Sequence, residues 1–235
     1  VPASLSAVLV IVLLLAGAAA SLGPLTAIDA PATAVAPAVR GTQVVLDPPP
    51  ERVGCRRVAV LGDSLMDNAR WYLLQELSAA RFDRIVEAHH SRRIPATVRA
   101  PYSGVTAALQ VRSAWGEADC WVVALGSNDL VYGGGEPATA TALVDAQIAA
   151  ITPGARVWWV NVNYRRDPSI AFDFPRATSV FNAELDRRAR LDPSFQVIDW
   201  YSLSTANAGW FFDPVHVDIA GSRARAAQAI DALPR

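Results

Sequence analysis

The chain has 235 residues and no lysine, so all 21 of its basic residues are arginines. It also lacks an excess of charge, because 22 acidic residues leave a formal net charge of −1 at pH 7. Nucleic-acid-binding proteins normally carry a basic surplus, so we expect no nucleic-acid partner. Only two cysteines are present, and they stand too far apart for the usual spacing of metal ligands. We therefore expect no metal site.

The N-terminal segment has no charged residue before Asp29 and contains an apolar run from Ala7 to Ala20. This run is shorter than the roughly 20 residues that span a bilayer, and Ala18-Ala19-Ala20 resembles a signal-peptide cleavage site. We therefore expect residues 1–20 to be a secretory signal, with an uncleaved anchor that associates with a membrane as the alternative. Residues 21–54 are rich in alanine and proline and are expected to form a linker. Such a protein would be secreted or held in the cell envelope.

From residue 55 onward, apolar runs rich in β-branched residues alternate with helical patterns. Strands are expected at 56–61, 83–88, 120–125, 155–162 and 195–199. Helices are expected at 68–80, 104–115, 138–151, 175–191 and 219–232. Because alternating strands and helices favour parallel pairing, residues 55–235 are expected to form one α/β domain. Its expected architecture is a three-layer α/β/α fold with a five-stranded, parallel, doubly wound sheet.

Cys55 and Cys120 each stand immediately before an expected strand. If those strands are parallel neighbours, both thiols lie at the same edge of the sheet, opposite the edge where ligands bind. An exported protein would oxidise them to a disulfide, whereas two buried free thiols are the alternative. The disulfide would close a loop of about 66 residues and stabilise the fold by roughly 4 kcal/mol.

The stretch Gly62-Asp63-Ser64 joins an apolar strand to a helical pattern. Ligands of open α/β folds bind at the carboxyl ends of the strands, which is where Ser64 would lie. Free N–H groups at the start of a helix also favour negative charge there. Ser64 is therefore a candidate nucleophile, with a helix cap as the competing interpretation. One face of this helix is expected to carry the apolar residues Leu65, Trp71, Leu73, Leu74 and Leu77.

Three later segments supply further polar groups. Asp213 stands three residues before His216, a spacing that would let the carboxylate hold the imidazole while it takes a proton from a serine. Asn128 follows a strand and would offer an amide N–H to the same region, although such residues also form ordinary turns. Gly104 would let a backbone N–H approach a ligand closely. Asp63 and Asp129 are expected to fix their turns by accepting hydrogen bonds from backbone N–H groups.

These segments follow one another as Gly62-Asp63-Ser64-Leu65, Gly104, Gly126-x-Asn128-Asp129 and Asp213-x-x-His216. Together they resemble the SGNH hydrolase superfamily, also called the GDSL-type esterases and lipases. The resemblance covers about residues 55–233. It implies a flavodoxin-like sheet and a serine esterase that cleaves oxygen esters through an acyl-serine intermediate, with no metal or organic cofactor.

The resemblance also implies a role for each matching residue. Ser64 would be the nucleophile, His216 the general base and then acid, and Asp213 the carboxylate that orients the histidine. The oxyanion would be held by the Ser64 and Gly104 backbone N–H groups and by the Asn128 side chain.

The substrate could be a small-molecule, lipid or acylated-glycan ester. The rings of Trp210, Phe211 and Phe212 would wall an acyl pocket or pack in the core. Arg165 and Arg166 could meet an anionic head group or form a solvated loop face. Two rival functions remain open: an O-acyltransferase or deacetylase acting on envelope polysaccharide, and a non-catalytic envelope-binding module with the same fold.

Overall fold

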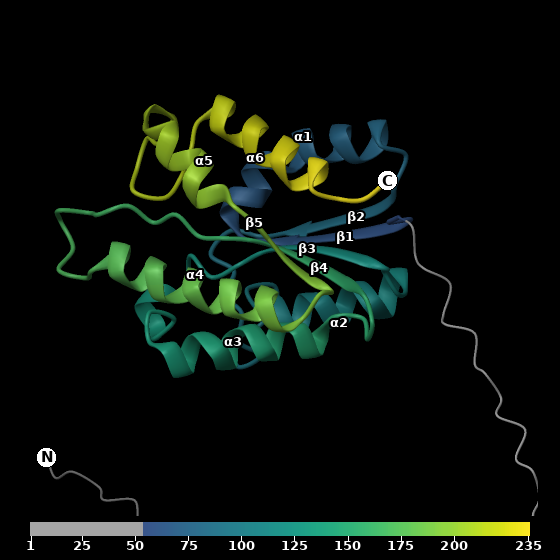
Figure 1. The fold of residues 1–235 in the computed structure, drawn as a ribbon, viewed down its shortest axis with the longest axis horizontal. Helices are drawn as coiled ribbons and strands as arrows, with labels where there is room; N and C mark the ends of the chain where they lie inside the picture. Colours follow the sequence, from purple (N-terminus) through teal and green to yellow (C-terminus); the bar gives the residue numbers. More distant parts are fainter. Residues whose placement is uncertain (1–53) are drawn as a thin grey trace, which may run out of the picture. The chain divides into compact units, whose positions relative to one another are not determined.

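The computed structural model describes residues 54–235, which form a sheet between two layers of helices (Figure 1). The strands are β1 Arg57–Gly62, β2 Asp83–Ala88, β3 Cys120–Ala124, β4 Arg156–Val160 and β5 Phe195–Ile198. The helices are α1 Ser64–Ala79, α2 Gly104–Trp115, α3 Pro137–Ala150, α4 Phe174–Leu191, α5 Trp200–Ala206 and α6 Ile219–Asp231. Two short 3₁₀ helices are η1 Leu130–Tyr132 and η2 Ala208–Trp210.

The signal or anchor expected at 1–20 lies outside the described residues, as does the linker expected at 21–54 apart from Gly54. Within the described part of the chain, no helix is both long enough and apolar enough to cross a membrane.

All neighbouring strands pair in parallel, in the order β2-β1-β3-β4-β5. From β1 the chain first moves to one edge of the sheet through β2, and then crosses to the other side through β3, β4 and β5. The direction therefore reverses between β1 and β3, and the loops that follow these two strands diverge and leave room for a ligand. The expected α/β/α architecture with a parallel, doubly wound sheet is confirmed.

The two faces of the sheet belong to separate hydrophobic cores. In β1, Val58 and Val60 pack with α1 and α6, whereas Ala59 and Leu61 pack with α2, α3 and α4 (Figure 1). This division follows from the alternation of side chains along a strand. Because helices cover both faces, the central strands are apolar on both sides, and this makes them visible in the sequence.

Helix α1 begins at Ser64, four residues before its expected start. Its buried residues are Leu65, Met66, Ala69, Leu73 and Leu77. The expectation that Trp71 and Leu74 share this buried face is wrong, since 67% of Trp71 and 36% of Leu74 are exposed. At 3.6 residues per turn, Trp71 lies on the side of the helix opposite the buried stripe.

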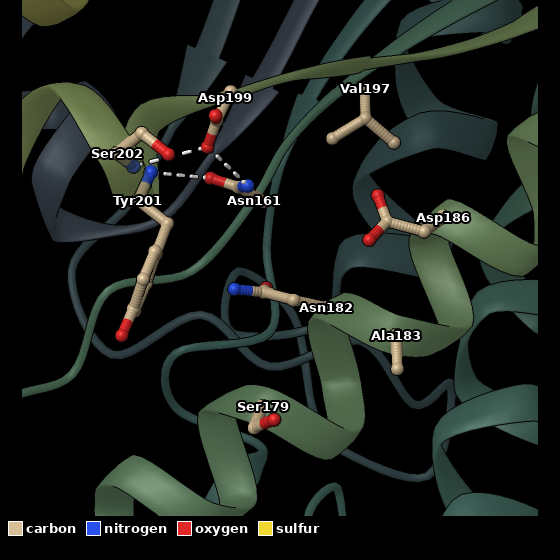
Figure 2. Close-up of a pocket in the computed structure, with 9 residues that line it drawn as sticks. All are labelled: Asn161, Ser179, Asn182, Ala183, Asp186, Val197, Asp199, Tyr201 and Ser202. Atoms are coloured by element: carbon tan, nitrogen blue, oxygen red, sulfur yellow. Dashed lines mark hydrogen bonds between the residues drawn. The ribbon is translucent and has the colours of Figure 1, made fainter.

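Helix α5 is not predicted by the sequence, because seven residues are too few to show a helical period. The first turn of α5 is fixed by hydrogen bonds from polar residues that follow β4 and β5 (Figure 2). Asp199 Oδ1 accepts hydrogen bonds from the Ser202 N–H at 3.1 Å and from Asn161 Nδ2 at 3.0 Å. Asn161 Oδ1 in turn accepts a bond from the Tyr201 N–H at 2.6 Å. The start of α5 is thereby attached to the ends of both strands.

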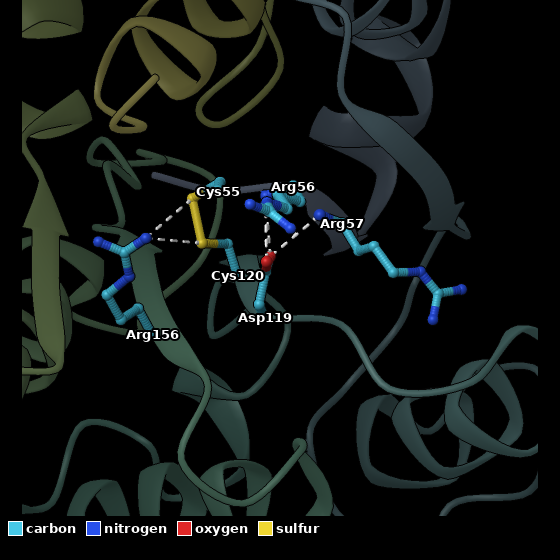
Figure 3. Close-up of a disulfide and its surroundings, with 6 residues drawn as sticks. All are labelled: Cys55, Arg56, Arg57, Asp119, Cys120 and Arg156. Atoms are coloured by element: carbon cyan, nitrogen blue, oxygen red, sulfur yellow. Dashed lines mark hydrogen bonds between the residues drawn. A yellow bond between two sulfur atoms is a disulfide. The ribbon is translucent and has the colours of Figure 1, made fainter. Parts of the chain in front are cut away.

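Cys55 and Cys120 form a disulfide between residues that are 65 positions apart in the chain (Figure 3). It joins the segment before β1 to the first residue of β3, at the amino ends of these strands. Beside it, the Asp119 carboxylate accepts hydrogen bonds from the N–H groups of Arg56 and Arg57 at 3.1 and 3.0 Å. The prediction of a disulfide at this edge of the sheet is confirmed.

Replacing both cysteines by alanine should lower the free energy of unfolding by about 4 kcal/mol, because the unfolded chain regains the freedom of a loop of about 66 residues. Urea unfolding followed by circular dichroism, with and without a thiol reductant, measures the change. The double-alanine variant is the control, because the reductant should not alter its midpoint. A wild-type midpoint that is equally insensitive to reductant would contradict the prediction.

Candidate active site

Ser64, His216 and Asp213 form a hydrogen-bonded chain at the carboxyl edge of the sheet. The distance from Ser64 Oγ to His216 Nε2 is 2.9 Å, and that from His216 Nδ1 to Asp213 Oδ2 is 2.7 Å. Ser64 is the first residue of α1, whereas the other two residues lie in the loop that precedes α6. The fold thus joins side chains that stand 152 positions apart in the sequence.

The loop that carries His216 is fixed by the carboxylate of Asp213. Asp213 Oδ1 accepts hydrogen bonds from the N–H groups of Val215 and His216 at 2.8 and 2.6 Å. The Pro214 carbonyl accepts a bond from the Arg165 N–H at 2.8 Å, which attaches the loop to the segment after β4. Partial burial alone would raise the pKa of Asp213, but the two N–H donors and the neighbouring imidazole outweigh it and hold the pKa below its usual value. The Asp213 carboxylate is therefore ionised at neutral pH.

This arrangement is suited to moving the hydroxyl proton of Ser64. When His216 Nδ1 donates its hydrogen to Asp213, the lone pair of Nε2 faces the serine oxygen and can accept its proton. The ionised carboxylate then stabilises the imidazolium that forms. About 30% of the His216 side chain is exposed, so a substrate can reach the pair. Serine nucleophiles that are activated by a neighbouring base have a geometry of this kind.

Asp63 is buried directly before the serine, with 1% of its surface exposed. Its Oδ1 accepts a hydrogen bond from the Leu65 N–H at 3.0 Å, which confirms the prediction that it fixes the turn. Burial raises the pKa of this carboxyl, and the positive charge of Arg225 opposes the shift. Arg225 comes from α6, is 2% exposed, and lies 4.9 Å from the centre of the Trp200 ring. The buried positive charge of α6 therefore offsets part of the effect of burial on the carboxyl that precedes α1.

The turn after β3 is attached to the loop after β2. Asn128 Nδ2 donates a hydrogen bond to the Arg92 carbonyl at 3.1 Å, which uses one of its two hydrogens. The Asp129 carboxylate accepts a bond from the Ile94 N–H, with its oxygens at 3.1 and 3.2 Å. Asp129 thus fixes a neighbouring loop by a backbone N–H, and not its own turn as expected.

Arg92 is a structural residue that the sequence pattern does not reveal. It is completely buried, and its guanidinium donates to three carbonyl oxygens, at Gly62, Glu87 and Pro101, at 2.8 to 3.3 Å. It also pairs with the Glu87 carboxylate at 2.6 Å. The guanidinium therefore holds the loop after β2 against the ends of β1 and β2.

Gly104 does not offer a free N–H to this edge of the sheet. Its N–H donates to the Arg93 carbonyl at 2.7 Å. A Cβ at this position would lie 2.4 Å from the Leu125 side chain and 2.6 Å from that of Gln147. The glycine therefore permits close packing at the start of α2. The expectation that its N–H holds an oxyanion is corrected, because this N–H already has an acceptor.

Ser91 is a second residue that the sequence pattern does not reveal. Its φ of 56° lies in the left-handed region, which residues other than glycine seldom adopt outside functional or strained sites. It lines a cavity of about 250 Å³ together with Asn128. Among the described residues, none accepts a hydrogen bond from its N–H. The one sequence signal is its position in a loop that follows a parallel strand.

The three aromatic residues before Asp213 have different environments. Trp210 and Phe211 are partly buried against the core on the α1 and α6 side of the sheet. Phe212 is 68% exposed and its ring stacks on that of His216, with centroids 6.0 Å apart. Core packing therefore accounts for the first two rings, and only Phe212 stands open beside the histidine.

A cavity of about 540 Å³ lies beside β5, between α4 and α5 (Figure 2). Its lining includes the carboxylates of Asp186 and Asp199, but not Ser64, Asp213 or His216. The amide of Asn182 in this cavity is bound to the backbone N–H and carbonyl of Val162, at 2.9 and 2.8 Å. Its polar groups therefore serve mainly to connect α4 and α5 to the strand ends.

No protein-family model and no curated protein matches the sequence. Solved structures do match. The catalytic domain of peptidoglycan O-acetyltransferase A from Streptococcus pneumoniae is 18% identical with a TM-score of 0.55, over 77% of this chain and 97% of that one. A lipase/acylhydrolase from Enterococcus faecalis is 15% identical with a TM-score of 0.57, over 77% and 98%. A carbohydrate acetylesterase family member from Sinorhizobium meliloti is 18% identical with a TM-score of 0.55, over 75% and 97%.

A putative SGNH hydrolase from Slackia heliotrinireducens is 18% identical with a TM-score of 0.54, over 75% of this chain and 97% of that one. These likenesses show that the described residues have the fold of the SGNH hydrolases, as the sequence motifs imply. The match covers nearly the full length of each of these four chains.

The pKa of Asp129 generates a prediction about stability. Burial raises this pKa to about 7, although the Ile94 N–H and the charge of Arg93 lower it. A folded-state pKa above the usual value means that stability is fully present at low pH and is lost as the pH rises through about 7. Because Asp129→Asn cannot ionise, its stability relative to wild type should increase by about 4 kcal/mol between pH 4 and pH 8.

Urea unfolding of both proteins across this pH range measures the difference. The exposed Asp231 provides a control for the loss of one charge, and Asp231→Asn should show no such trend. A difference between Asp129→Asn and wild type that does not vary with pH would refute the assignment.

Proposed function

We propose that the chain is an exported serine esterase of the SGNH hydrolase type, which hydrolyses oxygen esters. The observation that carries this proposal is the hydrogen-bonded chain from Ser64 through His216 to Asp213, at 2.9 and 2.7 Å. The likeness of the fold to that of a putative SGNH hydrolase and to those of a lipase/acylhydrolase and a carbohydrate acetylesterase family member supports it. The disulfide supports export, because such bonds persist in oxidising compartments.

In the proposed reaction, Ser64 Oγ attacks the ester carbonyl carbon while His216 Nε2 takes the hydroxyl proton. The tetrahedral intermediate then collapses, the bond from carbon to the alcohol oxygen breaks, and His216 returns the proton to the leaving alcohol. Water attacks the acyl-serine with His216 again as the base, which releases the acid and restores the serine. Asp213 stays ionised throughout and holds the imidazole in the required orientation.

The carbonyl oxygen becomes negative in the tetrahedral intermediate and needs hydrogen-bond donors. We propose the Ser64 N–H, the second Nδ2 hydrogen of Asn128 and the Ser91 N–H as these donors. The start of α1 contributes favourably to this negative charge. Ser91 takes the role of backbone donor that was first expected for Gly104. Its left-handed conformation and its place beside Asn128 in the lining of the same cavity support this role.

The proposed substrates are small-molecule or acylated-glycan esters. The cavity beside Asn128 has a volume of about 250 Å³, slightly below the usual range for small-molecule sites of roughly 300–1,000 Å³. Ser64 and His216 do not line it, so it supports short acyl groups through its place next to Asn128, a proposed oxyanion donor. Exposed Phe212 offers a further apolar contact beside His216.

Acyl transfer to a sugar hydroxyl is the second candidate, because one structure with this fold is a peptidoglycan O-acetyltransferase domain. The two reactions share the acyl-serine and differ in what attacks it. Incubation with a nitrophenyl ester and an oligosaccharide separates them, since transfer yields acylated sugar and hydrolysis yields only free acid.

Ser64→Ala should lower the rate of hydrolysis of 4-nitrophenyl acetate by a factor on the order of 10⁴ or more, because no nucleophile remains. It should also abolish labelling by a fluorophosphonate. The exposed Ser202 lies near the start of another helix, and Ser202→Ala is the matched control that should keep both properties. Equal labelling of Ser64→Ala and wild type would rule out the proposed nucleophile, and absence of labelling in wild type would favour a binding module.

Asn128→Ala should lower kcat by about 10² to 10³, the usual cost of losing one oxyanion donor, with a smaller effect on KM. Because Asn128 also binds the Arg92 carbonyl, thermal unfolding is needed to separate loss of catalysis from loss of structure. Asn128→Asp keeps the shape of the side chain but supplies no donor, so it should be at least as slow as the alanine variant. A kcat within a few-fold of wild type in Asn128→Asp would exclude this role.

A further inference from the structure

A cavity of about 280 Å³ lies between the segment that follows β4 and helix α5. Its lining includes Asn163, Tyr164, Arg165, Arg166, Ser204 and Thr205. No aspartate or glutamate lines this cavity, in contrast to the acidic cavity beside β5. It is therefore the more basic of these two neighbouring hollows.

The two arginines of this cavity are exposed and have no carboxylate partner. Within residues 54–235, no acidic oxygen lies within 4.0 Å of a guanidinium nitrogen of Arg165 or Arg166. The adjacent Asp167 accepts hydrogen bonds from the Ser169 N–H and hydroxyl at 2.9 and 2.6 Å, so its carboxylate is engaged in its own turn. Neither guanidinium group is neutralised by a carboxylate, so both can pair with an anion, and arginine is well suited to carboxylate and phosphate.

The floor of the cavity is polar and firmly held. Buried Asn163 donates from Nδ2 to Ser204 Oγ at 2.8 Å and to Thr205 Oγ1 at 3.2 Å. Ser204 Oγ in turn donates to the Trp200 carbonyl at 2.6 Å. These bonds connect the segment after β4 to α5. They therefore hold in place the backbone that carries the two arginines.

The cavity is attached to the loop of the catalytic histidine. The Arg165 N–H donates to the Pro214 carbonyl, two residues before His216, and the Arg165 guanidinium donates to the Ala208 carbonyl at 3.3 Å. Tyr164 lines both this cavity and the cavity beside Asn128. In the proposed reaction His216 gives a proton to the leaving alcohol, so the alcohol portion of the ester lies on the histidine side of the serine.

We propose that Arg165 and Arg166 bind a carboxylate or phosphate group carried by the alcohol portion of the ester substrate. This inference rests on the proposed esterase function and adds a preference for anionic alcohols. A neutral ester contacts only the catalytic centre, whereas an anionic ester of the same shape also pairs with the two guanidinium groups.

The test compares 4-acetoxybenzoate, which is anionic, with the neutral 4-acetoxybenzamide, and repeats the comparison with acetyl esters that carry the carboxylate one to three carbons further away. For at least one spacing, the ratio of kcat/KM for the anionic ester to that for its amide should be about tenfold higher in wild type than in Arg165→Gln/Arg166→Gln. The ratio should also fall as salt is added, because the charges are exposed.

Arg190→Gln is the matched control. Arg190 is an exposed arginine near the end of α4, about 22 Å along that helix from Pro175 at the cavity, so it should leave the ratio as in wild type. Thermal unfolding of each variant identifies any loss of folded protein.

A ratio that is the same in wild type and in the double variant at every spacing overturns the inference. A second result also overturns it: inorganic phosphate inhibits neutral-ester hydrolysis in wild type but not in the double variant, while wild type shows no preference for anionic esters. The cavity would then bind a free anion and not the substrate. If wild type hydrolyses neither ester and no fluorophosphonate labels Ser64, the proposed esterase function itself has failed.

Discussion

The parallel direction of all five strands is the constraint on which the site depends. Because β1, β2, β3 and β4 run the same way, the segments that follow them all emerge at one edge of the sheet. Ser64, Ser91 and Asn128 each belong to one of these segments, and the Arg165 segment follows β4. Only the loop of Asp213 and His216 must be brought to this edge separately, and the helices α5 and α6 that flank it do so. One antiparallel strand among these would send its segment to the disulfide edge.

Buried polar groups then hold the loops at this edge of the sheet in defined positions. Asp63 and Asp129 each accept a hydrogen bond from a backbone N–H, yet burial raises the pKa of both carboxyls. The proximity of the two carboxylates adds to the shift of Asp129. Such groups weaken folding when they ionise, so they are retained at a cost in stability. The positive charge of Arg225 offsets part of this cost at Asp63.

The sequence predicts the strands and most helices because both faces of the central sheet are buried and the apolar runs are continuous. It also predicts the Asp213 to His216 pairing and the disulfide, since both depend on short spacings or on the ends of strands. It does not predict which N–H groups remain free. The N–H of Gly104 is bound by the Arg93 carbonyl, a contact within the segment that joins β2 to α2 and that no local pattern encodes. Similarly, the left-handed conformation of Ser91 follows from contacts of the whole loop, which Arg92 and Asp129 hold at positions far apart in sequence.

Arg165 shows how one residue can serve two separable purposes at such an edge. Its backbone N–H donates to the Pro214 carbonyl and therefore supports the loop of Asp213 and His216, whatever the side chain at this position. Its side chain makes separate contacts: the Cζ atom lies 5.2 Å from the centre of the Phe211 ring, and the side chain lines the basic cavity. A substitution of the side chain leaves the backbone bond to Pro214 in place and removes the guanidinium bond to the Ala208 carbonyl. Because the bond to Pro214 comes from the backbone, the side chain at position 165 can vary without removing it. Variation of this kind at the edge of one fold is consistent with the many activities that a single scaffold can host.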